Sequence, residues 1–105
     1  MTVKFDVRIT PSAEKDLEDI WTYIADDSRK RASDFILVLE KQISTLEHFP
    51  ERCSLIPENE ILNSAHRHLI HGNYRTIFRV EGKRVYILRI LHGARLLDSS
   101  MLGSS

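Results

Sequence analysis

The sequence has one cysteine, four glycines and three prolines in 105 residues, and it contains no long apolar run. Because Cys53 is alone, no internal disulfide can form, which fits a reducing compartment. No stretch reaches the roughly 18 apolar residues that a membrane-spanning helix needs. The first ten residues alternate charged and apolar side chains and lack the apolar region of a signal peptide. We therefore predict a cytoplasmic protein that does not associate with membranes.

Net charge is absent as well, because 15 basic residues balance 15 acidic ones. The balance hides an asymmetry: residues 1–60 hold 8 basic and 13 acidic side chains, and residues 61–105 hold 7 and 2. Either the two parts neutralise each other in the fold, or the basic part meets an anionic partner. A chain of this length has the size of one domain. Residues 1–105 are therefore expected to form a single domain, with residues 98–105 as a flexible tail.

Hydrophobic periodicity predicts a strand followed by two helices in the first half of the chain. Residues 3–9 alternate with period two, as a strand with one buried face does. Thr10 and Pro11 supply an N-cap and a first helical position, and an apolar repeat follows over residues 13–24. A second repeat, over residues 32–46, begins near Ser28 and ends before Pro50. Residues 50–64 have no clear period and are predicted to be a loop with one short turn or strand.

Three strands are predicted in the second half, at residues 66–71, 74–80 and 84–92. The dipeptides Gly72-Asn73 and Gly82-Lys83 separate them, each with glycine first, as a type II′ hairpin turn prefers. The element order is β-α-α-β-β-β. It predicts an α+β fold in which a helical hairpin packs on a mainly antiparallel four-stranded sheet.

Two-residue turns also fix the register, so the residues on each face of the sheet can be derived. The face under the helices is predicted to carry Leu69, Tyr74, Thr76, Phe78, Val80, Val85, Ile87 and Leu91. The opposite face mixes bases with aliphatic residues: His66, His68, Ile70, Arg75, Ile77, Arg79, Arg84, Tyr86, Leu88, Ile90 and His92. Four of these aliphatics (Ile70, Ile77, Leu88 and Ile90) would be costly to leave bare, which predicts that a partner chain covers them. The bases would meet phosphates or acidic side chains.

Arg89 does not fit this register, because it falls on the apolar face opposite Thr76. A buried arginine needs a carboxylate, which the acidic first helix would supply. Otherwise a β-bulge shifts the register, and the faces near the end of the strand exchange.

The ordered pattern "HRHLIHGNYRTIFRV…RVYILRILHGAR" follows a strand, a "TPSAEKDLEDIWTYI" helix and a second helix ending in "LEHFP". Over roughly residues 3–98 this set resembles the RelE/ParE superfamily of toxins from bacterial type II toxin–antitoxin systems. The resemblance implies a cytoplasmic toxin that forms a hetero-oligomer with a cognate antitoxin protein. It leaves the target open, because RelE-like members are ribosome-dependent mRNA endonucleases, whereas ParE-like members poison DNA gyrase.

Within this resemblance, individual residues can be compared with the nucleases. Arg75, in "NYRTIF", matches the middle-strand arginine that contacts phosphate, and His92 and Arg95 stand where nucleases often place an acid/base or a phosphate-binding group. The nucleases also tend to carry lysines before the central strand and a tyrosine beyond the last one. Here "PENEILNSAHRH" has no lysine and "LLDSSMLGSS" has no tyrosine. The sequence is therefore closer to ParE-like and plasmid-stabilisation members.

Three hypotheses follow, and they leave open whether the chain is an enzyme. The first is a gyrase-binding toxin that needs no catalytic pair. The second is a metal-independent mRNA endonuclease, with His92 as acid/base and with Arg75 and Arg95 holding phosphate. The third is a non-toxic component that only binds the antitoxin or represses transcription. No metal or other cofactor is expected, since His66 and His68 lack further ligands at a recognised zinc spacing.

Overall fold

The computed structural model describes residues 4–93, 95 and 101. Its strands are β1 (Asp6–Ile9), β2 (Arg67–His71), β3 (Tyr74–Glu81) and β4 (Arg84–His92). Its α-helices are α1 (Pro11–Ala25), α2 (Arg29–Ser44) and the single turn α3 (Asn59–Leu62), with 3₁₀ turns at Thr45–Glu47 and Pro50–Arg52. The predicted tail lies mostly outside the described residues.

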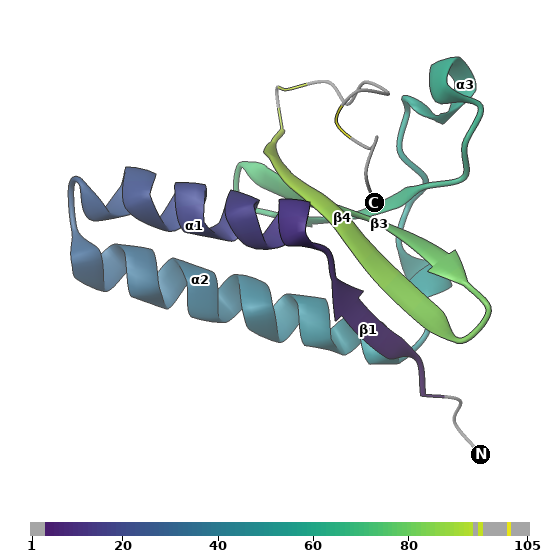
Figure 1. Ribbon diagram of the computed structural model, residues 1–105, viewed down its shortest axis with the longest axis horizontal. Coiled ribbons are helices and arrows are strands. Elements are labelled where there is room, and N and C mark those ends of the chain that lie inside the picture. Colours follow the sequence, from purple (N-terminus) through teal and green to yellow (C-terminus); the bar gives the residue numbers. More distant parts are fainter. Residues whose placement is uncertain (1–3, 94, 96–100, 102–105) are drawn as a thin grey trace.

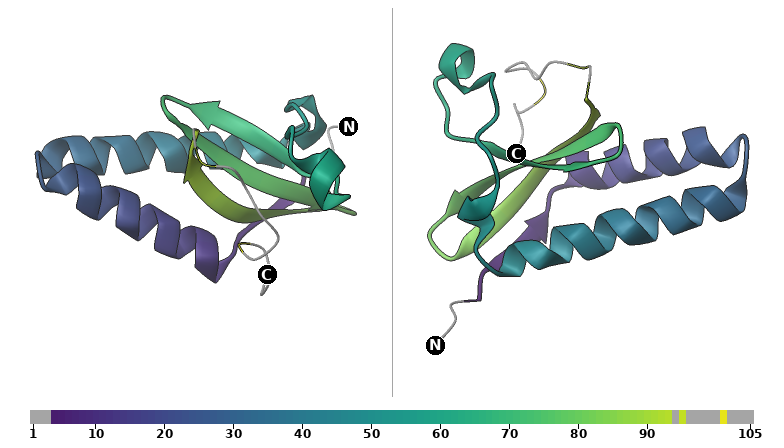
Figure 2. Two further views of the ribbon diagram at one scale, coloured as in Figure 1. Left: turned by 90° about the horizontal axis from the view of Figure 1, so that it is seen from above. Right: turned by 180° about the vertical axis from the view of Figure 1, so that it is seen from behind.

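The four strands form one sheet in the order β1-β4-β3-β2. β1 runs parallel to β4, and the other two pairs are antiparallel. Figure 1 shows β1 beside β4, with α1 and α2 antiparallel to each other and projecting beyond the sheet. The views in Figure 2 place α3 at the far side of the sheet from this hairpin. The predicted α+β architecture is confirmed.

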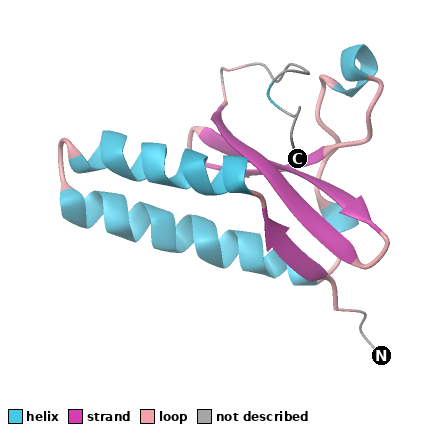
Figure 3. Cartoon of the chain, in the orientation of Figure 1, coloured by secondary structure: helices cyan, strands magenta, loops and turns pink. Residues whose placement is uncertain are grey.

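The helices start and the strands turn where local chemistry predicts. The side chains of Thr10 and Ser28 accept hydrogen bonds from backbone N–H groups at the starts of α1 and α2, and Pro11 opens α1. Gly72 and Gly82 have φ values of +56° and +61°, whereas the residues after them do not have positive φ, as type II′ turns require. The connection from α2 to β2 is largely irregular (Figure 3). Over residues 50–64 one short turn or strand was expected, and the structure has two helical turns and an isolated β-bridge between Leu55 and Arg67.

A β-bulge in β4 corrects the predicted register. Phe78 pairs with Ile87 but its neighbour Ile77 pairs with Arg89, so Leu88 is the extra residue. Beyond the bulge the faces exchange: Ile90 joins the core beneath the helices, and Leu91 joins a second cluster on the opposite face. The first face assignment was therefore wrong after Ile87, and the bulge alternative is confirmed.

Asp16 of α1 explains how Arg89 is accommodated. Its carboxylate accepts hydrogen bonds from Arg89 Nε (2.7 Å) and Nη2 (2.9 Å) and from the backbone N–H of Ile90 (2.9 Å). Because β1 ends at Ile9, which pairs with Ile87, no strand among the described residues lies beside this part of the β4 edge. The acidic helix thus neutralises Arg89 and also provides a hydrogen-bond acceptor for the backbone N–H of Ile90 at the open edge.

Candidate functional site

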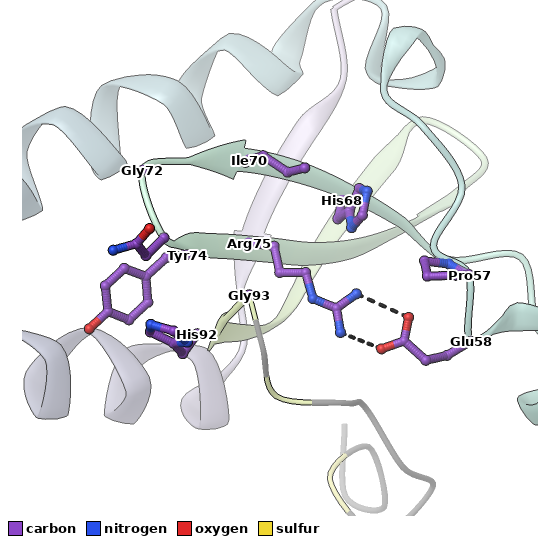
Figure 4. Close-up of a pocket in the computed structure, with 10 residues that line it drawn as sticks. Pro57, Glu58, His68, Ile70, Gly72, Tyr74, Arg75, His92 and Gly93 are labelled. Atoms are coloured by element: carbon purple, nitrogen blue, oxygen red, sulfur yellow. Dashed lines mark hydrogen bonds and ion pairs between the residues drawn. The ribbon is translucent and has the colours of Figure 1, made fainter.

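A cavity of about 430 Å³ lies at the end of the sheet where β2, β3 and β4 meet the loop before α3. Figure 4 shows the side chains around it. Its lining brings together four of the residues predicted from sequence: His68, Ile70, Arg75 and His92. Pro57, Glu58, Tyr74, Gly93 and the Gly72-Asn73 turn complete the wall. Two residues predicted to be catalytic and two predicted to contact a partner therefore share one cavity.

Arg75 is buried in this cavity, and both of its outer nitrogens donate hydrogen bonds, whereas its buried Nε has no acceptor among the described residues. Only 6% of the residue is exposed, and its Nη1 donates to Glu58 Oε1 at 3.0 Å. Its Nη2 donates to Glu58 Oε2 and to the Arg95 carbonyl oxygen, the latter at 2.9 Å. Figure 4 shows the guanidinium pointing at Glu58. Both outer nitrogens thus already have oxygen acceptors, where a phosphate would otherwise bind.

Glu58 is the residue of the candidate site that the sequence analysis missed. It is 5% exposed and precedes the single turn of α3. Asn59 holds this loop against β2, because its amide donates to the His66 carbonyl at 2.8 Å and its carbonyl accepts from the His66 N–H at 3.0 Å. One of three glutamates in an aperiodic loop gives no local signal that it reaches a strand 17 residues later.

The histidines of the region differ in their surroundings. Burial lowers the pKa of His68, and the positive charge of Arg75 lowers it further, against an opposing effect of Glu58. Burial and then Arg79 lower the pKa of His66. Both rings are therefore neutral near pH 7. His92 is exposed at the cavity rim, and its ring lies edge-on to Tyr74 at 5.6 Å between centroids.

The structure corrects the prediction for three of the aliphatic residues that were expected to bind a partner. Ile77, Leu88 and Ile90 are 0%, 2% and 3% exposed, so they do not form a bare surface. Ile77 is covered by Ile56 of the loop, and the bulge turns Ile90 toward the helices. Among the four predicted aliphatics, Ile70 alone stays exposed, at 63%.

Two other predicted bases, Arg79 and Arg84, lie away from the cavity. Arg79 and Arg84 line a second hollow with Arg8, Thr10 and Tyr86, at the opposite end of β4 from His92. Within the part of the chain that the structure describes, His, Cys, Asp and Glu side chains do not gather in threes as a metal site would require. No helix among the described residues is long and apolar enough to cross a membrane.

Comparison with known proteins decides the family. The sequence model described as "ParE toxin of type II toxin-antitoxin system, parDE" matches residues 7–97. Toxin ParE1 of Caulobacter vibrioides is 33% identical over 88 residues, which cover 81% of this chain and 85% of that protein.

The chain belongs to the ParE toxin family. It is thus a member of the RelE/ParE superfamily of type II toxin–antitoxin systems, as the sequence resemblance indicated.

Solved structures agree with this ParE-family fold. The chromosomal ParDE toxin–antitoxin system from P. aeruginosa superposes with a TM-score of 0.67 at 22% identity, covering 87% of this chain and 98% of that one. The toxin–antitoxin complex RelBE2 from Mycobacterium tuberculosis gives 0.60 at 22% identity, covering 86% and 99%. At such identities the likeness concerns the fold, and it extends to both branches of the superfamily.

Proposed function

We propose that this ParE-family chain inhibits growth by binding and poisoning DNA gyrase, and that a cognate antitoxin neutralises it. The observation that supports the proposal most directly is that protein oxygens already bind the Arg75 guanidinium. In the ribonuclease hypothesis Arg75 stabilises the charge of the scissile phosphate, yet this guanidinium is buried against Glu58 and the Arg95 carbonyl. A toxin that acts by binding needs no such group, and the ParE match over residues 7–97 supports the same choice.

The ribonuclease alternative retains one supporting observation, because His92 and Arg75 line the same cavity. For that chemistry Arg75 would first have to leave Glu58, which breaks a buried ion pair. Breaking such a pair costs about 3–5 kcal/mol. The alternative therefore requires a rearrangement that gyrase binding does not.

The antitoxin contact is proposed at the rim of the same cavity. Ile70 is exposed there, and the wall beside it combines apolar side chains with few charged ones. An apolar side chain of the antitoxin would fill this space and cover Ile70. Because apolar burial contributes most and the chain has no net charge, binding should depend only weakly on salt.

The gyrase proposal is tested with purified chain in a supercoiling assay, using His92→Gln as the diagnostic variant. Glutamine keeps a polar side chain at the rim but cannot transfer a proton near neutral pH. If gyrase binding is the mechanism, the wild type inhibits supercoiling and the variant inhibits it to within a few-fold. If His92 were instead the general acid or base of a ribonuclease, its replacement would lower the rate of mRNA cleavage by about 10²–10⁴-fold.

The mRNA of cells that express each form provides the second arm of the experiment. New 5′ ends within codons that appear with the wild type and vanish with His92→Gln would favour the nuclease. Absence of supercoiling inhibition at micromolar protein would reject the gyrase proposal.

A further inference from the structure

The second hollow, of about 400 Å³, is lined by three arginines from three different strands: Arg8, Arg79 and Arg84. Tyr86 lies between two of them, because it pairs with Arg8 across β1–β4 and with Arg79 across β3–β4. Neighbours that pair across strands present their side chains on one face. The arrangement is therefore a row of Arg8, Tyr86 and Arg79, with Arg84 two residues away along β4.

This row lies on the face of the sheet that the helical hairpin leaves uncovered. The residues next to Tyr86, Val85 and Ile87, point into the core beneath the helices, so Tyr86 points the other way. The hollow is also distinct from the Arg75 cavity, since the two share no lining residue.

Arg79 and Tyr86 form a stacked platform. The guanidinium carbon of Arg79 lies 4.6 Å from the centroid of the Tyr86 ring, within the range of a cation–π contact. Strands of a sheet are about 4.8 Å apart, so Arg8 and Arg79 flank the tyrosine with backbones about 10 Å apart. Two cations on either side of an aromatic ring can contact successive anionic groups of a polymer. A single small ion would contact them less well.

The acids near these arginines do not neutralise the hollow. Arg8 contacts Asp6 at 2.8 Å and Arg79 contacts Glu81 at 2.9 Å, but all four side chains are at least 39% exposed. Exposed pairs of this kind contribute little to stability, so a phosphate can compete for the arginines. Among the described residues around the hollow, three arginines thus stand against two acids.

We propose that this hollow binds the phosphate backbone of a single-stranded nucleic-acid segment, with a base stacked against the Arg79–Tyr86 platform. Sites for single strands combine a positive groove with aromatic and arginine planes on which bases stack. An acidic protein segment is the weaker fit. Its carboxylates would offer the arginines only what Asp6 and Glu81 already provide, and it would leave the platform unused.

The experiment measures binding of short, fluorescently labelled single-stranded DNA and RNA of one sequence by anisotropy. Both arms use the full chain between about 50 and about 200 mM salt. Arg8→Gln, Arg79→Gln and Arg84→Gln should each weaken binding about tenfold, the loss of one charge-assisted contact. Each should also reduce the slope of log affinity against log salt by about 0.7.

Matched variants distinguish the effect of the arginines in the hollow from that of base stacking and from that of positive charge elsewhere on the protein. Tyr86→Leu should weaken binding with no change in salt slope, and Tyr86→Phe should bind like the wild type. Arg31→Gln removes an exposed arginine from α2, which covers the other face of the sheet, and should change neither quantity. Tighter binding of either the DNA or the RNA oligonucleotide identifies which nucleic acid the hollow binds.

Failure to bind either strand at the lowest salt would overturn the proposal, as would arginine variants that bind like the wild type. Displacement by polyglutamate at equal concentration, with the same loss in the three variants, would assign the hollow to an acidic protein instead. These results are independent of gyrase inhibition, because supercoiling is measured separately on the same variants.

Discussion

At the scale of single residues, the buried pair of Arg75 and Glu58 has the largest consequence. Each side chain is less than 10% exposed, and the pair ties the loop before α3 to the middle of the sheet. A charge that loses its partner at such a site cannot be solvated, whereas removing both charges leaves nothing unpaired. The pair therefore controls both stability and access to the Arg75 guanidinium.

We expect Glu58→Ala to lower the free energy of unfolding by about 3–5 kcal/mol. The double variant Glu58→Leu/Arg75→Met should recover most of that loss. Glu81→Ala breaks an exposed pair and should cost about 1 kcal/mol or less. Urea denaturation of the variants measures these values, and equal losses for Glu58→Ala and Glu81→Ala would contradict the description of the site.

His66 and His68 make stability depend on pH at the same scale. Both have a pKa below the ordinary value of 6.5 in the folded chain, so the unfolded chain binds more protons as the pH falls through that value. The free energy of unfolding should thus be highest above pH 6.5 and decrease in more acidic solution. In the variant His66→Gln/His68→Gln the decrease between neutral and mildly acidic pH should be smaller. An unchanged decrease would show that other groups cause it.

At the scale of elements, the contact between α1 and the bulged part of β4 holds the helical hairpin to the sheet. Asp16 accepts three hydrogen bonds from this strand, two of them from Arg89. The side chains of Asp16 and Arg89 are only 10% and 16% exposed, so water screens the contact little. The bulge at Leu88 is what places Arg89 and the Ile90 N–H toward the same carboxylate.

Asp16→Ala should therefore destabilise the chain by about 3–5 kcal/mol, because it removes the carboxylate that pairs with the largely buried Arg89 and accepts from the Ile90 N–H. Asp19→Ala is the matched control on the same helix. Its partner is Lys15 in an exposed i,i+4 pair, so the loss should be about 0.5 kcal/mol. Thermal or urea unfolding compares the two, and similar losses would be inconsistent with a structural role for Asp16.

The same elements show how far sequence reasoning reaches. Thr10, Ser28 and the two glycine turns act on their immediate neighbours, so their positions could be predicted. The bulge depends on contacts between distant elements, and Arg89 within an apolar run was its one visible sign. Glu58 gave no such sign, because its partner is set by how the loop folds back. Four residues of the cavity could thus be predicted from the sequence: Arg75, His92, His68 and Ile70. The contact of Glu58 with Arg75 could not.

At the scale of the whole molecule, the charge asymmetry of the sequence is resolved in two ways. Acids of the first part reach bases of the second, as Asp16 and Glu58 do with Arg89 and Arg75. Other bases gather in the hollow around Tyr86. The cavity and the hollow are therefore suited to different partners, one largely apolar and one anionic.

The proposed antitoxin contact gives a test of this division. Ile70→Asp should weaken antitoxin binding at least about tenfold, because it places a charge in an apolar interface. Ile61→Asp changes another exposed isoleucine, 89% exposed on α3, and should have little effect. Calorimetric titration at two salt concentrations measures both. Equal effects of the two substitutions, or a steep salt dependence for the wild type, would place the antitoxin elsewhere.

The most direct test of the account is the trapping of covalent gyrase–DNA complexes in cells that express the chain without its antitoxin. We predict that such complexes accumulate as growth stops, and that they accumulate equally with His92→Gln. Growth arrest without these complexes, accompanied by new mRNA ends that disappear in His92→Gln, would contradict the account.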